Sequence, residues 1–243
     1  SVKDSVLKQL ETMILLEEHM GDYEVSLSDK EKNAIESTAK EFDEANALED
    51  KEKISGSLKT VKRVMTLMAI QQKMTEAIQA DADTEVSDEE AAQKSMQYVL
   101  FPYTTKDADG KSVDLSDEEK AEDFAEAAKT AEDFGAFATE QGVEASTITF
   151  DKDSSTPSAD LIAAADKLGE GEVTEMIEAE NGCYVGKVTS LFDREATDTK
   201  KQSIVNDRKT DLYTKTCEKW LKKADIKVNK SVWKKVDFND LSV

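Results

Sequence analysis

A short apolar run, Tyr98-Val99-Leu100-Phe101, ends at Pro102 and constrains the fold of this chain more than any other feature. The surrounding sequence is mostly acidic and helix-forming, whereas a short apolar, aromatic run that ends at proline is typical of a strand. A strand that is apolar at successive positions needs cover on both of its faces. The run therefore predicts the central strand of a sheet that is packed on both sides.

Composition excludes several classes of function. The chain has 243 residues and a formal net charge of −21, which argues against nucleic-acid binding and against simple adsorption to an anionic membrane. No apolar run is long enough to span a bilayer. Cys183 and Cys217 lack metal-ligand spacing, and His19 is the single histidine. We therefore expect no metal, no cofactor and no transmembrane segment in this sequence.

One phrase occurs three times, as "SLSDKE", "EVSDEE" and "DLSDEE". In each copy a serine is followed three residues later by a glutamate, the capping-box pattern that satisfies free backbone amides at a helix start. The copies predict helix starts near residues 29, 88 and 117. The serine and glutamate pairs are Ser28–Glu31, Ser87–Glu90 and Ser116–Glu119.

Residues 95–195 read as an α+β module of four strands. The strand at 97–103 is followed by a polar turn, a long helix from 117 to about 141 and a helix at 157–168. Thr156 is the expected N-cap of the latter helix and Pro157 its first residue. Asn181-Gly182 predicts a type I′ hairpin turn. The other expected strands are 146–150, 173–179 and 183–190.

The flanks of this module are helical and differ in charge. Residues 1–94 read as helices only. Residues 196–243 carry 12 basic and 7 acidic residues and contain a helix from 199 to about 224. We expect this basic, tryptophan-bearing tail to pack on the acidic N-terminal lobe, and an external anionic surface is the alternative. The methionine-rich helix that starts near residue 58 is expected to be a core helix. An adaptable client-binding surface is its alternative.

Four phrases carry a resemblance to a known family. They are "EVSDEEAAQKSMQYVLFPY", "AEDFGAFATE", "AADKLGEGEVTEMIEAENGCYVGKVTSL" and "TCEKWLKKADIKVN", in this order over nearly the entire chain. Together they resemble the PrsA/SurA-type extracytoplasmic foldases, in which a parvulin peptidyl-prolyl isomerase domain is inserted between helical segments. The resemblance implies an α+β fold. A helical lobe (1–94 with 196–243) would flank a parvulin-like domain (95–195) that has a four-stranded, mainly antiparallel sheet.

The departures from the family pattern concern its catalytic site. The positions of the family's two histidines match Tyr98 and Tyr184, and that of an acidic or cysteine residue matches Ser146. These three residues occupy the site positions, but we assign no catalytic residue. Tyrosine hydroxyls can donate and accept hydrogen bonds. The alternative is that both tyrosines are ordinary strand residues that pack across the sheet.

The family's proline pocket is also altered. The positions that line it match Pro157, Leu161 and Asp166, so a carboxylate would stand where the family has an apolar side chain. The resemblance implies that Leu100, Phe150 and Leu161 bind substrate. An isomerase domain with this altered pocket is expected to be catalytically impaired.

The resemblance implies a foldase or holdase chaperone. Its partners would be unfolded secreted polypeptides, and its place would be outside the cytoplasm, secreted or held by a lipid anchor ahead of Ser1. One alternative is an active parvulin-type isomerase that uses tyrosines in place of histidines. A second alternative is a non-catalytic scaffold or adhesion module that retains only the fold.

Overall fold

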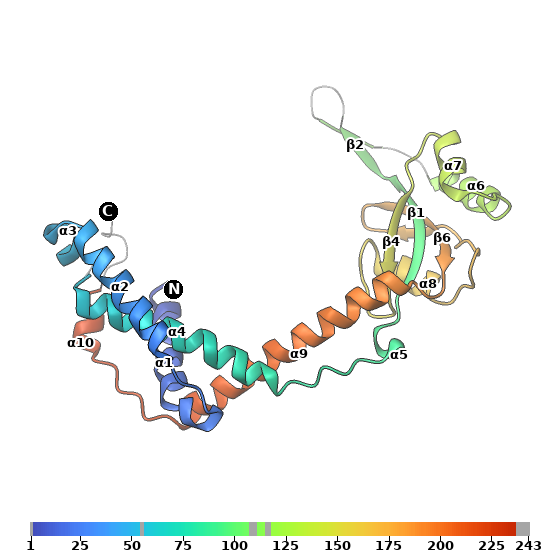
Figure 1. Cartoon of the computed structure of the whole chain (residues 1–243). Coiled ribbons are helices and arrows are strands. Elements are labelled where there is room, and N and C mark those ends of the chain that lie inside the picture. Colours follow the sequence, from blue (N-terminus) through green and yellow to red (C-terminus); the bar gives the residue numbers. More distant parts are fainter. Residues whose placement is uncertain (1, 54–55, 107–110, 115–117, 237–243) are drawn as a thin grey trace. The chain divides into compact units, whose positions relative to one another are not determined.

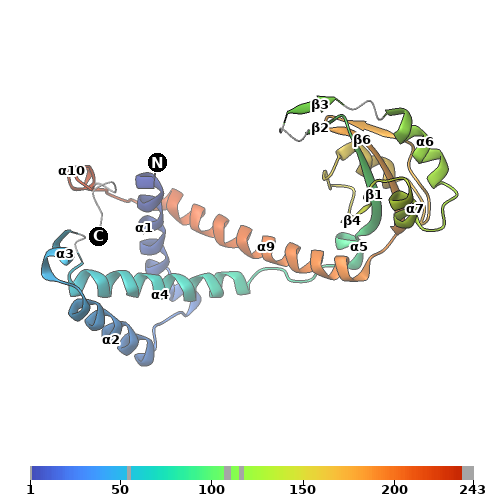
Figure 2. The ribbon, with the colours of Figure 1, turned by 90° about the horizontal axis from the view of Figure 1, so that it is seen from above.

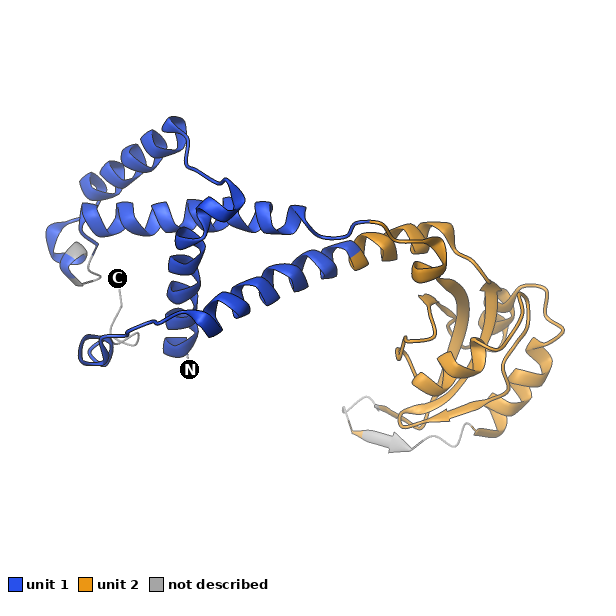
Figure 3. Cartoon of the chain, turned by 90° about the horizontal axis from the view of Figure 1, so that it is seen from below, with its two compact units in different colours: residues 1–84, 205–243 blue, residues 85–204 orange. Residues whose placement is uncertain are grey.

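The structure, a computed structural model, describes residues 2–53, 56–106, 111–114 and 118–236. The chain divides into two units, unit 1 of residues 1–84 with 205–243 and unit 2 of residues 85–204 (Figure 3). Unit 2 thus begins before and ends after the module of 95–195 expected from the sequence. Helix α9 (Arg194–Lys223) contributes its first turns to unit 2 and the remainder to unit 1.

Unit 1 is helical in its described part, and α1 and α2 lie against α4 (Figure 2). Its elements are α1 (Val2–Glu18), the 3-10 helix η1 (Met20–Tyr23), α2 (Asp29–Ala45), α3 (Leu48–Lys53), α4 (Leu58–Ala80), the end of α9 and α10 (Lys230–Trp233). The apolar cluster of this unit combines residues of α1 and α4 with residues of α9. Its members include Leu16, Ile70, Met74, Ile78, Leu212, Tyr213, Cys217 and Trp220. None of the described helices has the length and apolarity to cross a bilayer.

The methionine-rich helix α4 has both a buried and an exposed apolar face. Met74 is fully buried in the cluster, as the core interpretation expects. Val64 and Met68, one turn apart, are 42% and 56% exposed. The exposed pair is therefore free to contact another molecule.

Unit 2 contains a four-stranded antiparallel sheet with the strand order β4-β1-β6-β5. Strand β1 (Lys94–Pro102) lies between β4 (Ser146–Phe150) and β6 (Gly182–Ser190), and β5 (Ile177–Ala179) pairs with β6 (Figure 1). The short helix α5 (Asp88–Ala91) precedes β1. The apolar run therefore forms a central strand, and the predicted α+β fold with a four-stranded antiparallel sheet is confirmed.

Helices cover both faces of the sheet. On one face α6 (Glu118–Ala128) and α7 (Phe134–Glu140) pack on Val99 and Phe101 of β1. On the other face α8 (Ala159–Ala165) packs on Met96 of β1, and we call this the α8 face. Side chains along a strand point alternately to opposite faces, which is why the apolar run supplies residues to both cores.

Several local predictions are wrong or incomplete. The helix expected over 117–141 is two helices, because Asp133 accepts a hydrogen bond from the Ala136 amide (2.9 Å) and begins α7. The N-cap of α8 is Ser158 rather than Thr156, so Pro157 precedes the helix. The polar turn after β1 contains a hairpin, β2 (Thr104–Lys106) and β3 (Ser112–Asp114). The Ser28 capping box at α2 is confirmed, and Ser116 lies outside the described residues.

The hairpin between β5 and β6 differs from prediction in its register. Ala179 pairs with Gly182, so the two-residue loop is Glu180-Asn181 and Gly182 is the first residue of β6. Gly182 has a φ of +152°, a conformation that favours glycine. A Cβ at this position would collide with the Phe101 carbonyl oxygen. The glycine is needed where β6 approaches β1, and not as the centre of a type I′ turn.

Candidate functional site

The α8 face brings together the positions that the sequence assigns to the family site. In β1, Tyr98 lies opposite Ser146 of β4 on one side and Gly186 of β6 on the other. Two residues further along β1, Leu100 lies opposite Tyr184 of β6. Cross-strand neighbours share a face, so these side chains form one surface beside α8. Ser146 is exposed at its edge.

The two tyrosine rings are in contact, with centroids 5.9 Å apart and ring planes inclined by 48°. Tyr184 is 2% exposed, and its hydroxyl accepts a hydrogen bond from Asn181 Nδ2 (2.9 Å) and donates one to Asn181 Oδ1 (3.2 Å). Asn181 belongs to the β5–β6 loop, so the hairpin holds the Tyr184 hydroxyl. Tyr98 is half-buried, and among the described residues its hydroxyl has no hydrogen-bond partner.

Two of the three expected substrate-binding residues belong to the core. Phe150 and Leu161 are fully buried, whereas Leu100 is half-buried. Gly186 allows this packing, because a Cβ there would lie 3.2 Å from Leu161 Cδ1 and 3.3 Å from a sulfur, Met96 Sδ. Phe150 and Leu161 therefore fill the space between the sheet and α8.

The suspected carboxylate in the pocket lies elsewhere. Asp166 follows the last turn of α8, where its Oδ1 pairs with Lys94 Nζ at 2.9 Å and its carbonyl accepts a hydrogen bond from the same nitrogen. The pair joins α8 to the beginning of β1. The prediction that Asp166 stands inside an apolar pocket is wrong.

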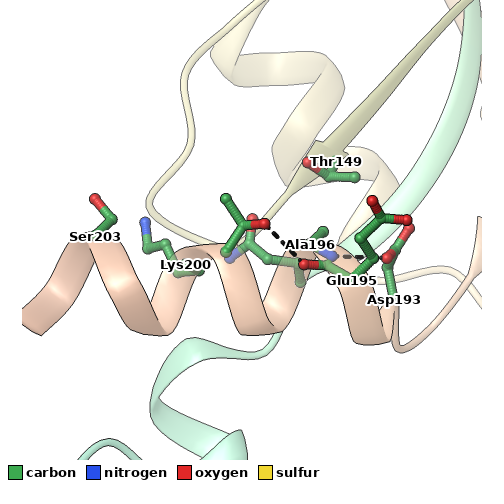
Figure 4. A pocket seen from close by; sticks show the side chains of 8 residues that line it. Thr149, Asp193, Glu195, Ala196, Lys200 and Ser203 are labelled. Carbon is green, nitrogen blue, oxygen red and sulfur yellow. Dashed lines mark hydrogen bonds between the residues drawn. The ribbon is translucent and has the colours of Figure 1, made fainter.

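A groove lies where β1 and β4 meet the start of α9 (Figure 4). Asp193 accepts hydrogen bonds from the Ala196 amide (2.9 Å) and from Ser95 Oγ (2.6 Å), and these bonds hold the pKa of its carboxyl below its usual range. The groove has a volume of about 430 Å³. Its lining residues are Gln93, Thr149, Asp193, Glu195, Ala196, Thr199, Lys200 and Ser203.

Asp151 is the most strongly held carboxylate beside this groove. Its burial raises the pKa, but hydrogen bonds from Gln93 Nε2 (2.9 Å), Lys200 and Ser154 outweigh that effect and keep the pKa well below its usual range. A carboxylate that stays ionised and fully bonded is suited to joining β4 to α9, not to proton transfer. The sequence analysis did not predict the hydrogen bonds of Asp151 or Asp193. For Asp193 a signal was present, because an aspartate just before a helix is typical of a helix start.

A second depression lies on the opposite face of the sheet, between α6 and α7. It has a volume of about 470 Å³. The Phe124 ring is part of its lining, with centroid distances of 5.5 Å to Phe101 and 5.0 Å to Phe137. Phe137 and Val143 are only partly buried, so apolar surface is accessible there. Among the described residues no group of three potential metal ligands occurs at either depression or elsewhere.

Comparison with known proteins identifies the domain that carries these features. The family model of the PPIC-type PPIASE domain matches residues 93–201, which contain the sheet, α6 to α8 and the tyrosine pair. Residues 93–201 are thus similar to the PPIC-type PPIASE domain. The parvulin-like domain predicted from the sequence is confirmed.

Solved structures that are similar to this chain include the foldase protein PrsA from Streptococcus pneumoniae, at 21% identity and a TM-score of 0.43, covering 96% of this chain and 88% of that chain. The peptidylprolyl isomerase PrsA from Bacillus cereus has 20% identity and a TM-score of 0.39, with coverages of 100% and 92%. A SurA-like chaperone of Campylobacter jejuni has 13% identity and a TM-score of 0.36, with coverages of 93% and 89%. None of the curated proteins matches this chain.

Proposed function

We propose that the protein is an extracytoplasmic foldase that holds unfolded secreted polypeptides, and that its PPIC-type domain does not accelerate proline isomerisation. The match of residues 93–201 to that domain, set between helical segments, supports the chaperone class. The proposed location, secreted or tethered by a lipid anchor ahead of Ser1, rests on the resemblance to PrsA and SurA-like proteins. One of these is described as periplasmic.

The burial of the expected proline pocket carries the proposed loss of catalysis. Rotation about an X–Pro bond crosses a barrier of about 18–20 kcal/mol. An enzyme must grip the ring in an apolar pocket and place a polar group at the twisting amide. Phe150 and Leu161 are fully buried against the sheet, so neither side chain faces a ligand. The Tyr184 hydroxyl is already bonded to Asn181.

One observation favours the second candidate, an active isomerase. The Tyr98 hydroxyl has no partner among the described residues, and Ser146 beside it is exposed. A free hydroxyl at this edge of the sheet could donate a hydrogen bond to a substrate carbonyl. The two candidates differ in whether removal of this hydroxyl changes the rate of isomerisation.

Exposed apolar side chains support the holding of clients. Val64 and Met68 form a pair on α4, and methionine adapts to client side chains of different shapes. The depression beside Phe137 and Val143 offers a second apolar contact. Holding an unfolded chain requires such surfaces and no catalytic group.

The holding function is tested by the aggregation of a chemically unfolded client. At about equimolar ratio the protein is expected to slow aggregation, and Val64→Ser with Met68→Gln is expected to weaken client affinity by at least about tenfold. The matched control is Val2→Ser with Leu48→Gln, which removes two apolar side chains, each 69% exposed, from other helices of unit 1. Light scattering measures the effect. No protection by the unchanged protein would refute the proposal.

A further inference from the structure

The C-terminal part of unit 1 carries an unusual concentration of positive charge. Between Lys219 and Val236 the sequence has seven lysines and a single acid, Asp225, in a chain whose net charge is −21. The lysines occupy the last turn of α9, the connection to α10 and α10 itself with the residues after it. We call the following residues the basic surface: Lys219, Lys222, Lys223, Lys227, Lys230, Lys234 and Lys235.

Within the described part of unit 1, other residues neutralise little of the charge of this surface. All seven lysines are exposed. Within the described part of the chain, Lys227 has the one ion pair of the set, at 3.5 Å from Asp225, and both of its members are almost fully solvated. Such exposed pairs hold each other weakly. The basic surface therefore presents most of its charge to a partner.

Contacts with α1 fix part of the basic surface in place. Lys3 Nζ donates hydrogen bonds to the carbonyl oxygens of Lys234 (3.4 Å) and Val236 (2.5 Å). The same nitrogen lies 5.6 Å from the centre of the Trp233 ring. These contacts hold α10 beside the first turn of α1 and add another cation to the surface.

Aliphatic side chains lie among the lysines. Ile226 is 39% exposed and Val232 is 58% exposed. Lysines interleaved with exposed aliphatic groups suit the headgroup region of an anionic bilayer, where cations meet lipid phosphates and apolar groups enter the acyl boundary. A soluble polyanion offers no such apolar layer.

We propose that the basic surface docks the protein on an anionic lipid bilayer. The inference rests on the proposed extracytoplasmic function only for its biological setting. The net charge of −21 argues against adsorption of the whole molecule. At about 0.15 M salt, however, charges act over about 8 Å, so acids elsewhere on the chain are screened from a bilayer that contacts this surface. Docking is thus local and orients unit 1 on the bilayer.

The test is sedimentation of the full chain with vesicles. We expect binding to phosphatidylcholine vesicles that contain about one third phosphatidylglycerol, and none to phosphatidylcholine alone. Because each surface lysine contributes roughly fivefold in affinity, the variant Lys222→Gln, Lys223→Gln, Lys230→Gln is expected to bind at least about tenfold more weakly. Raising the salt from about 0.1 M to about 0.5 M should release the unmodified protein.

A control variant with the same change in net charge is Lys30→Gln, Lys59→Gln, Lys167→Gln, in which three exposed lysines outside the basic surface are neutralised. It should bind as the unmodified protein does. Equal weakening in both variants, or equal binding to both vesicle types, would overturn the proposal. Binding of soluble polyphosphate without binding of vesicles would also overturn it and assign the surface to an anionic polymer. The client-aggregation assay contains no lipid, so failure of the chaperone proposal is seen separately.

Discussion

Replacing Gly182 with alanine is expected to cost about 3 kcal/mol or more of the stability of unit 2. The added Cβ would collide with the Phe101 carbonyl oxygen and would lie 2.8 Å from both Leu100 Cδ1 and Pro102 Cα. Two of these three atoms belong to the backbone of the central strand, which cannot move without loosening the sheet. The φ of +152° adds strain for any residue with a side chain.

Urea unfolding of the full chain, followed by far-ultraviolet circular dichroism, measures this loss. Both tryptophans, Trp220 and Trp233, belong to unit 1, so their fluorescence follows that unit separately. The matched control is Gly135→Ala in α7, where a Cβ would be 3.5 Å from its nearest neighbours. Alanine in a helix should be neutral or stabilise by about 0.5–1 kcal/mol. A Gly182→Ala protein as stable as the control would contradict the close approach of β6 to β1.

Replacing Phe150 with alanine is expected to destabilise unit 2 by about 3–5 kcal/mol, the usual cost of removing a buried phenylalanine. Phe150 is fully buried between the sheet and α8, together with Leu161 and Met96. This result separates a core residue from a substrate-binding residue, because truncating an accessible pocket residue would affect client affinity and leave stability nearly unchanged. Urea unfolding and the aggregation assay on the same variant measure both quantities.

The control for Phe150→Ala is Thr149→Ala, one position earlier on the same strand. Thr149 is exposed and lines the groove at the start of α9 (Figure 4). Its replacement should cost less than about 1 kcal/mol. A stable Phe150→Ala protein that fails to hold clients would instead support the role of Phe150 in substrate binding that the family resemblance implies.

The general fold could be predicted because its determinants are local. The run Tyr98 to Phe101 alternates between two covered faces, and Ser28 with Glu31 specifies a helix start through bonds within one turn. Such signals depend only on neighbours in sequence. They place the central strand and the first residues of α2 without knowledge of the tertiary structure.

The remaining details depend on contacts between distant residues. The burial of Leu161 requires the missing side chain of Gly186, and the role of Gly182 is set by the backbone of Phe101. Asp166 pairs with Lys94, which lies 72 positions away in the sequence. The sequence therefore identified which residues share the α8 face, but it could not show which of them fill the core.

The rate of isomerisation of a proline-containing peptide tests the central claim of holding without catalysis. We expect the unmodified protein to leave the peptide at its uncatalysed rate, with a time constant of tens to hundreds of seconds at 25 °C. The variant Tyr98→Phe with Tyr184→Phe should give the same rate. Clear acceleration by the unmodified protein, lost in this variant, would contradict the account and make the protein an isomerase that uses its tyrosines.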